Sequence, residues 1–312
     1  MAVNILLTGA TGFLGSRLAE VLNSIPDVSL SAAVRRRVEI SASNLFEVPS
    51  LEASTDWSLV LTNQLVVIHA AARAHIMKDE LVDPLEEYRR VNVDGTLNLA
   101  RQAAAAGVKR FIFISSIGVN GNINTRPFTK EDTPNPAELY AKFKWEAEKG
   151  LWGIQRETGM ELLIIRPPLV YGPNAPGNFG SLIRWIEIGV PLPFGCIHNQ
   201  RSLVALDNLV DLIITSIEHP AAANQVFLAG DGQDLSTTEL LRGVAKAAGK
   251  SSRLIPVPSS LLMFAATLFG KKAVAQRLLG SLQVDISKAR DLLGWEPPIS
   301  VEEGLHRCFS KD

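Results

Sequence analysis

Short apolar runs alternate with amphipathic segments through the first half of the chain. Runs rich in Val, Ile, Leu and Phe predict five strands, at residues 3–9, 28–36, 64–72, 109–116 and 160–168. Helical patterns predict helices near residues 13–23, 83–106 and 138–158. Strands that alternate with helices of about ten or more residues are typical of βαβ units, which build a parallel sheet with helices on both faces.

The pattern changes after residue 170. Pro and Gly crowd residues 167–195, shorter elements follow, and one apolar helical stretch covers 259–281. We therefore expect an α/β fold with a doubly wound parallel sheet in residues 1–170 and a smaller lobe in 171–312, some segments of which return to the sheet. The 259–281 stretch is predicted to form core in this lobe, with a membrane-surface or partner role as the alternative.

Composition bounds the class of partner. In 312 residues that are 46% hydrophobic, 31 Lys and Arg balance 32 Asp and Glu, so no basic excess points to nucleic acid. The most apolar run, residues 261–269, is far shorter than the roughly 20 residues that cross a bilayer. The first residues enter a strand pattern without a basic signal region. We therefore expect a cytoplasmic protein with a small-molecule partner, no nucleic acid and no membrane span.

The residues that bind metals do not cluster. Cys196 and Cys308 are far apart in the sequence and form no CxxC pair, and the five histidines show no metal-ligand spacing. We predict neither a disulfide framework nor a metal site.

Three glycines lie where the first predicted strand meets the first predicted helix. Gly9, Gly12 and Gly15, in the segment TGATGFLG, are spaced by three. Glycine here permits a tight turn, lets the backbone approach a pyrophosphate and lets the helix pack closely on its strand. The free N–H groups and positive dipole of the first helical turn favour phosphate. The segment predicts dinucleotide binding, with a purely structural turn as the alternative.

The end of the second predicted strand bears on the choice of dinucleotide. An acidic residue there would bind the adenosine ribose and favour NAD. This chain has AAVRRRVE, with no Asp or Glu before Glu39. Arg35 and Arg36 instead offer guanidinium groups that pair bidentately with a 2′-phosphate. We predict NADP in preference to NAD, and a solvated basic loop is the alternative.

A serine pair and a YxxxK motif carry the candidate chemistry. Ser115 and Ser116 end one strand, and Tyr140 and Lys144 lie four residues apart on a later helix, hence on one face. Tyrosine ionises near pH 10, so proton transfer near neutrality requires its pKa to fall by roughly three units. An ammonium about 5 Å away contributes on the order of 3 kcal/mol at an effective dielectric near 20. Lys144 is expected to supply most of the shift, although a lone YxxxK is ordinarily a pair of residues on the surface of a helix.

These motifs together resemble the short-chain dehydrogenase/reductase superfamily, particularly its extended branch, which acts on nucleotide sugars. The resemblance spans residue 3 to about residue 307 and implies a Rossmann-type sheet with a smaller substrate-binding lobe. It implies that Ser116, or the adjacent Ser115, binds the reacting sugar oxygen, that Tyr140 moves its proton and that Lys144 holds the nicotinamide ribose. The cofactor-binding residues that it implies, apart from Arg35 and Arg36, are Gly9, Thr11, Gly12, Phe13, Leu14, Gly15, Ala70, Ala71, Ala72, Asn92 and Pro167. An ordinary helix cap is the alternative for Asn92.

The substrate side rests on the same resemblance. The segments LIIRPPLVYGPN, NFGSLIRW and NQRSLVALDNLVDLI are similar to those that hold a nucleotide diphosphate, which implies Asn178 and Arg201 as substrate-binding residues, with solvated loops as the alternative. The whole pattern looks closest to bacterial surface-polysaccharide enzymes. The two long helices imply a homodimer.

Two reactions fit such a site. A reductase would use NADPH to reduce a UDP-4-keto-6-deoxy-N-acetylhexosamine to a UDP-N-acetylquinovosamine-type product, whereas a UDP-hexose 4-epimerase would keep NAD bound. Because Arg35 and Arg36 favour an exchangeable NADP, the reductase is our main expectation and the epimerase the alternative. A cofactor-sensing protein without turnover is a third, remote reading, because such proteins commonly lack the Tyr and Lys.

Overall fold

The computed structural model describes residues 3–73 and 84–310. Within these residues the central sheet has seven parallel strands in the order β3-β2-β1-β4-β5-β6-β9. They are β1 (Val3–Thr8), β2 (Val28–Val34), β3 (Asn44–Glu47), β4 (Val66–His69), β5 (Arg110–Ile114), β6 (Glu161–Arg166) and β9 (Gln225–Leu228). The five predicted strands are confirmed, whereas β3 and β9 are not among the strands that the sequence predicts.

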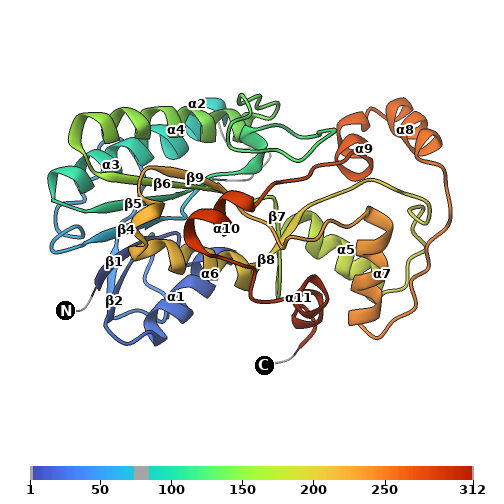
Figure 1. Cartoon of the computed structure of the whole chain (residues 1–312), viewed down its shortest axis with the longest axis horizontal. Helices are drawn as coiled ribbons and strands as arrows, with labels where there is room; N and C mark the ends of the chain where they lie inside the picture. The colour runs from blue at the N-terminus through green and yellow to red at the C-terminus, as the bar shows by residue number, and fades with distance from the viewer. Residues whose placement is uncertain (1–2, 74–83, 311–312) are drawn as a thin grey trace.

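Helices cover both faces of the sheet (Figure 1). On one face lie α1 (Phe13–Ser24) and α6 (Leu206–Glu218), and on the other α2 (Pro84–Arg89), α3 (Thr96–Ala105) and α4 (Leu139–Thr158). Alternate side chains of β1 enter different cores, since Ile5 and Leu7 pack on the α1 side and Leu6 on the α3 side. Burial on both faces explains why these strands read as continuous apolar runs.

The predicted helix at 83–106 is interrupted by a π-helical segment, η1 (Arg90–Gly95), between α2 and α3. A Cβ on Gly95 would lie 2.5 Å from the carbonyl oxygen of Leu51, so only glycine fits this contact. Segments of π-helix are frequent at functional sites, and this one carries the buried Asn92.

A buried arginine ties α6 to the sheet. Arg110, at the start of β5, donates from Nη1 to the carbonyl oxygens of Ser216, Ile217 and His219 at the end of α6, and it pairs with Glu161. Those carbonyls have no partner within the helix itself, so the guanidinium acts as the C-cap. A segment from the second half of the chain is thereby fixed to the first half.

The lobe contains a two-stranded parallel sheet, β7 (Leu169–Tyr171) and β8 (Leu203–Ala205). Around it pack α5 (Gly177–Glu187), α7 (Thr237–Ala247) and α11 (Val301–Arg307), whereas α10 (Ser287–Leu293) packs toward the central sheet. Phe13 contacts both the sheet core and the lobe core. The first residue of α1 thus joins the two parts.

The prediction that residues 259–281 form lobe core is wrong. This stretch makes two helices, α8 (Ser259–Leu268) and α9 (Lys272–Leu279), separated at Gly270, which has φ +67°. Helix α8 has no buried residue. Within the described ranges, no helix combines the length and the apolar character that crossing a bilayer requires.

Strand order locates the candidate site. Strand β1 lies between β2 and β4, so the chain moves outward through β2 and β3 and then returns to the other side of β1 at β4. Loops that leave adjacent parallel strands in opposite directions open a crevice at their carboxyl ends. The glycine segment follows β1 and residues 70–72 follow β4, so both border this crevice.

Candidate active site

The turn between β1 and α1 has no room for side chains. Gly9 has φ +77°, and a Cβ there would lie 2.6 Å from the amide nitrogen of Ala71. A Cβ on Gly15 would lie 2.0 Å from the carbonyl oxygen of Gly9. Gly12 differs, because its Cβ would meet only that same oxygen, at 3.2 Å. Gly9 and Gly15 are therefore needed for packing, whereas Gly12 faces outward.

The start of α1 is open to an anion. Gly12 is the N-cap and supplies no side-chain cap, and Thr11 and Gly12 are exposed. The side chains of Phe13 and Leu14 pack on the core. The backbone N–H groups at the start of a helix have no acceptor within it, and together with the dipole they favour a phosphate. This cradle fits the pyrophosphate of a dinucleotide.

Beneath the turn a buried histidine links three elements. The hydroxyl of Thr96 donates to the carbonyl oxygen of Asn92 (3.0 Å), so it accepts from Nε2 of His69 (2.9 Å). Nδ1 of His69 then accepts from the hydroxyl of Thr8 (2.6 Å), whose oxygen accepts from the amide of Ala71 (3.4 Å). Burial, together with the charge of Lys144, lowers the pKa of His69 to about 3. The ring is therefore neutral and has a defined tautomer.

The loop after β4 is held by Asn92. Its Oδ1 accepts from the backbone N–H of Arg73 (2.8 Å) and its Nδ2 donates to the carbonyl of Arg73 (2.9 Å). Ala70 and Ala71 are half-buried against the glycine turn, and Ala72 is exposed. Asn92 is fully committed to this loop, so it acts on the crevice by fixing the loop.

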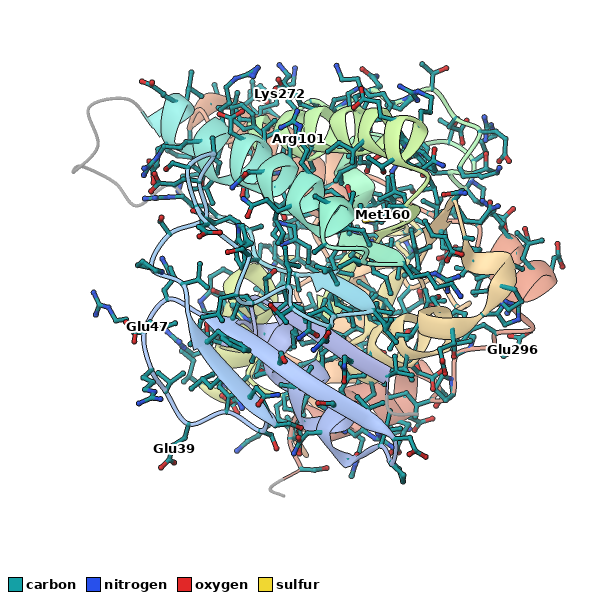
Figure 2. The ribbon with its side chains drawn as sticks, turned by 90° about the vertical axis from the view of Figure 1, so that its left-hand side faces the viewer. Glu39, Glu47, Arg101, Met160, Lys272 and Glu296 are labelled. Carbon is teal, nitrogen blue, oxygen red and sulfur yellow. The ribbon has the colours of Figure 1, made fainter. Side chains whose placement is uncertain are left out.

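The carboxyl end of β2 is cationic. Arg35 and Arg36 follow the strand directly and are exposed, and neither has an ion-pair partner in the described part of the chain. The next acidic residue, Glu39, extends away from the sheet at the periphery of the molecule (Figure 2). Two unpaired guanidinium groups therefore lie at the end of the strand beside β1.

The two serines have different environments. Ser115 is buried, and its hydroxyl donates to Oε1 of Glu148 at 2.5 Å. Ser116 is partly exposed, and its Oγ accepts from the amide of Gly118 at 3.1 Å, so its own proton remains available. A Cβ on Gly118 would lie 3.1 Å from Cβ of Ala141 and 3.3 Å from Oγ of Ser116, so the turn that begins at Ser116 packs on the start of α4. Of the two, only Ser116 has a hydroxyl free to meet a ligand.

The lysine does not lower the pKa of the tyrosine in the free chain, so that expectation is wrong. Burial and the neighbouring Tyr88 raise the pKa of Tyr140 to about 12. The ammonium of Lys144 donates to the carbonyl of Ile114 (2.7 Å) and lies 4.4 Å from the ring centre of Phe113 but 5.8 Å from that of Tyr140. Burial lowers its own pKa to about 7, against the opposing effect of Glu148. Helical spacing places both residues on one face but does not determine where the ammonium points.

The sequence analysis does not predict a buried ion pair that lies next to Lys144 on α4. Glu148 is fully buried and accepts from Nε (3.0 Å) and Nη2 (2.5 Å) of Arg166, the last residue of β6. Nη1 of Arg166 donates to Oδ1 of Asn120 at 2.9 Å. One sequence signal was present, because Glu148 follows Lys144 by four residues and so continues the Tyr140–Lys144 face. Pro167, next along from Arg166, is buried and accepts from the amide of Ile117 through its carbonyl.

The structure describes the side-chain surroundings of one of the two predicted substrate residues. Arg201 donates from Nη1 to the carbonyls of Arg277 (2.6 Å) and Gly280 (3.0 Å), so part of its guanidinium supports the end of α9. Burial lowers its pKa. The side chain of Asn178 lies outside the described part of the structure.

A cavity of about 680 Å³ opens beside α4. It is lined by Asn120, Phe128, Glu138 and Arg277 among others, and Glu138 is the N-cap of α4, two residues before Tyr140. Arg277 pairs with Glu138 across it at 2.6 Å. Its volume lies within the range of about 300–1,000 Å³ that small-molecule sites occupy. Sequence analysis gave no sign of this cavity, since its walls come from separate segments of the chain.

Comparison with known proteins gives a consistent result. Residues 5–230 match the model of the NAD dependent epimerase/dehydratase family. The chain is 50% identical over 308 residues to a UDP-glucose 4-epimerase of Vibrio cholerae, covering 98% of this chain and 94% of the relative. It is 29% identical over 322 residues to the N-acetyl-alpha-D-glucosaminyl-diphospho-ditrans,octacis-undecaprenol 4-epimerase of Escherichia coli O157:H7, covering 98% and 94%. The structure of the UDP-glucose 4-epimerase of Thermotoga maritima with UDP-glucose is similar, with a TM-score of 0.78, 25% identity, and coverage of 98% and 97%.

The buried pair predicts a strong difference between single and double variants. Glu148→Leu leaves Arg166 buried without its counterion, so the free energy of unfolding should fall by about 3–5 kcal/mol in urea denaturation. Glu148→Leu combined with Arg166→Met should recover most of that loss. The control is Glu146→Leu, a change on the same helix as Glu148. It breaks the partly exposed pair with Arg89 of α2 and should lower the free energy of unfolding by less than about 1 kcal/mol. A double variant no more stable than Glu148→Leu would refute this account.

The burial of Lys144 predicts a pH-dependent gain in stability. Between its folded pKa of about 7 and its ordinary value of 10.5, the unfolded state binds more protons, so the cost of this lysine shrinks as pH rises. Lys144→Met should raise the free energy of unfolding of the cofactor-free protein by about 1–3 kcal/mol at pH 7. This figure is the net gain once the lost hydrogen bond to the carbonyl of Ile114 has been subtracted. The gain should disappear near pH 10, as measured by urea denaturation across this range.

A control for the Lys144 experiment lies two residues earlier. Lys142→Met removes an exposed lysine from the same helix and should show no such pH dependence. A gain from Lys144→Met that stays constant from pH 7 to 10 would contradict the assigned protonation.

Proposed function

The chain belongs to the NAD-dependent epimerase/dehydratase family, and we propose that it is a UDP-sugar 4-epimerase. The observation that carries this proposal is the 50% identity to a UDP-glucose 4-epimerase over nearly its whole length. The site supports it, because Ser115 and Ser116 follow the carboxyl end of β5, as the glycine turn follows that of β1. Lys144, in the second turn of α4, contacts the same end of β5 through the carbonyl of Ile114.

The dinucleotide would lie with its pyrophosphate on the N-terminus of α1 and its remaining part along the loop after β4. When bound, an oxidised nicotinamide supplies the hydride acceptor and a positive charge. Within the chain, the free hydroxyl of Ser116 binds the sugar 4-oxygen and Tyr140 removes and returns the proton of that oxygen. Lys144 is held against the carbonyl of Ile114, 5.8 Å from the ring centre of Tyr140, and we assign it to the nicotinamide ribose of the bound dinucleotide.

The protonation states set a condition on catalysis. With a pKa of about 12, Tyr140 stays protonated at neutral pH in the chain alone. Acting as a base near pH 7 would require about 7 kcal/mol of favourable interaction with its charged form. Lys144 alone does not supply this, so proton removal by Tyr140 depends on a loaded site. An enzyme that keeps its dinucleotide bound through the catalytic cycle satisfies this condition.

The 4-keto reductase remains as a second candidate because of Arg35 and Arg36. Their exposure at the end of β2 supports affinity for a 2′-phosphate, and hence for NADP. The relative with 50% identity is an epimerase, so we rank the reductase second. Recognition of a UDP-sugar and assembly into a homodimer through the α3–α4 side are further parts of this proposal.

The decisive experiment measures turnover and the nature of the reaction. Tyr140→Phe removes only the phenolic oxygen, so kcat for interconversion of UDP-glucose and UDP-galactose should fall by about 10²–10⁴-fold while dinucleotide binding persists. Tyr171→Phe, the same chemical change at a tyrosine whose hydroxyl donates to Asp231 in the lobe, should retain kcat within about threefold. Full turnover by Tyr140→Phe would refute the assigned role. NADPH consumption with a UDP-4-keto-6-deoxy sugar, without interconversion of UDP-hexoses, would instead favour the reductase.

The cofactor preference can be tested separately from turnover. Arg35→Ala/Arg36→Ala should weaken NADP binding by about 10–100-fold and leave NAD binding almost unchanged, because charge-assisted bonds to the 2′-phosphate are lost. Arg37→Ala serves as the matched control. Calorimetric titration of each variant with both dinucleotides gives the ratio of the dissociation constants for NAD and NADP. Equal losses of affinity for the two would contradict a role specific to the 2′-phosphate.

A further inference from the structure

Helix α8 carries an apolar face that nothing in the described structure covers. Leu261, Phe264 and Leu268 follow one another at helical spacing and are 56%, 63% and 70% exposed. Phe269, directly after the helix, is 80% exposed. No residue of α8 is buried. A stripe of large apolar side chains that faces outward on a soluble lobe is typical of an interaction surface.

The stretch of chain that carries this face is rich in basic residues. Residues 240–284 contain no Asp or Glu and seven basic residues: Arg242, Lys246, Lys250, Arg253, Lys271, Lys272 and Arg277. The chain as a whole has a net charge of −1, so the rest of it carries −8 once this segment's +7 is removed. Lys271 and Lys272 adjoin Phe269, are exposed and form no ion pair within residues 3–73 and 84–310. Two of the seven pair with carboxylates from outside the segment, Lys246 with Glu302 and Arg277 with Glu138. The positive charge that adjoins the apolar face is therefore that of Lys271 and Lys272.

The position of α8 leaves this surface accessible. Helices α8 and α9 lie together at the end of the lobe farthest from β1 and β2 (Figure 1). Their mutual contact holds α8 on α9, while the stripe of Leu261, Phe264 and Leu268 stays exposed. A flat surface could reach the whole stripe together with Phe269 and Lys271.

We propose that α8, with Phe269, Lys271 and Lys272, docks on an anionic phospholipid surface. Apolar side chains would enter the boundary between headgroups and acyl chains, and the lysines would pair with lipid phosphates. A second copy of this chain fits the surface less well, because it would bring the exposed Lys271 and Lys272 of both copies together. The helix has only 10 residues, so it would lie in the interface without crossing the membrane.

Docking has a geometric consequence for the site. Gln276 and Arg277, on α9, line the cavity beside α4, and α9 packs directly on α8. Binding through α8 would therefore hold the cavity near the membrane surface. This inference does not depend on the proposed reaction, since it rests on exposure and charge alone.

The test is co-sedimentation of the full chain with vesicles. The protein should bind phosphatidylcholine vesicles that contain about 30% phosphatidylglycerol and bind pure phosphatidylcholine much less, and added salt should weaken the interaction. Phe264→Ser/Phe269→Ser should lower the partition coefficient by at least about tenfold. Lys271→Glu/Lys272→Glu should do the same, whereas Arg101→Glu/Lys109→Glu, with an identical change in net charge on exposed positions in and after α3, should have little effect.

Thermal unfolding and circular dichroism establish that each variant is folded before binding is compared. Wild-type protein that fails to bind anionic vesicles would overturn the proposal, as would unchanged binding by Phe264→Ser/Phe269→Ser. Light scattering tests whether a second copy of the chain covers this surface instead. A dimer that does not bind vesicles and that dissociates in the phenylalanine variant would replace the membrane with a second copy of the chain.

Discussion

The whole site depends on a contact that excludes side chains, the packing of the β1–α1 turn against itself and against the end of β4. Gly15 lies on the carbonyl of Gly9, and Gly9 lies on the amide of Ala71, at distances that admit no Cβ. This closeness directs the uncapped start of α1 into the crevice at the strand ends. Buried hydrogen bonds through Thr8, His69 and Thr96 hold the same three segments from below. Because no flexible group takes part, the phosphate cradle is preorganised.

Helix α4 presents three ionisable groups on one face, and burial gives each a different role. Tyr140 is partly exposed and stays protonated, Lys144 is buried with a pKa near 7, and Glu148 is fully buried against Arg166. The buried carboxylate favours the charged ammonium, which a purely apolar pocket would neutralise. Such a pocket costs stability, as expected where catalysis requires a charge in a dry site. The Arg166–Glu148 pair therefore acts on the face that carries Tyr140 through its effect on Lys144.

The lobe adds two features that the sheet lacks. Its cavity lies between the start of α4 and α9, and an ion pair between Glu138 and Arg277 joins these elements. Its outer surface combines exposed apolar side chains on α8 with the exposed Lys271 and Lys272. The lobe thus offers a small-molecule cavity on one side and an interaction surface on the other. A single short helix, α9, borders both.

The sequence by itself determined those features that depend on neighbours along the chain. Alternation of apolar runs and helices predicts the parallel sheet, three glycines predict the tight turn, and four-residue spacing places Tyr140 and Lys144 on one face. Tertiary structure alone decided which of Ser115 and Ser116 keeps a free hydroxyl, where the Lys144 ammonium points, and that α8 is exposed. The reason is physical: hydrogen-bond partners, burial and local charge come from segments far apart in sequence, such as Glu148 with Arg166 or Arg201 with Arg277. Periodicity reports which side of an element is apolar, but it does not report what lies against that side.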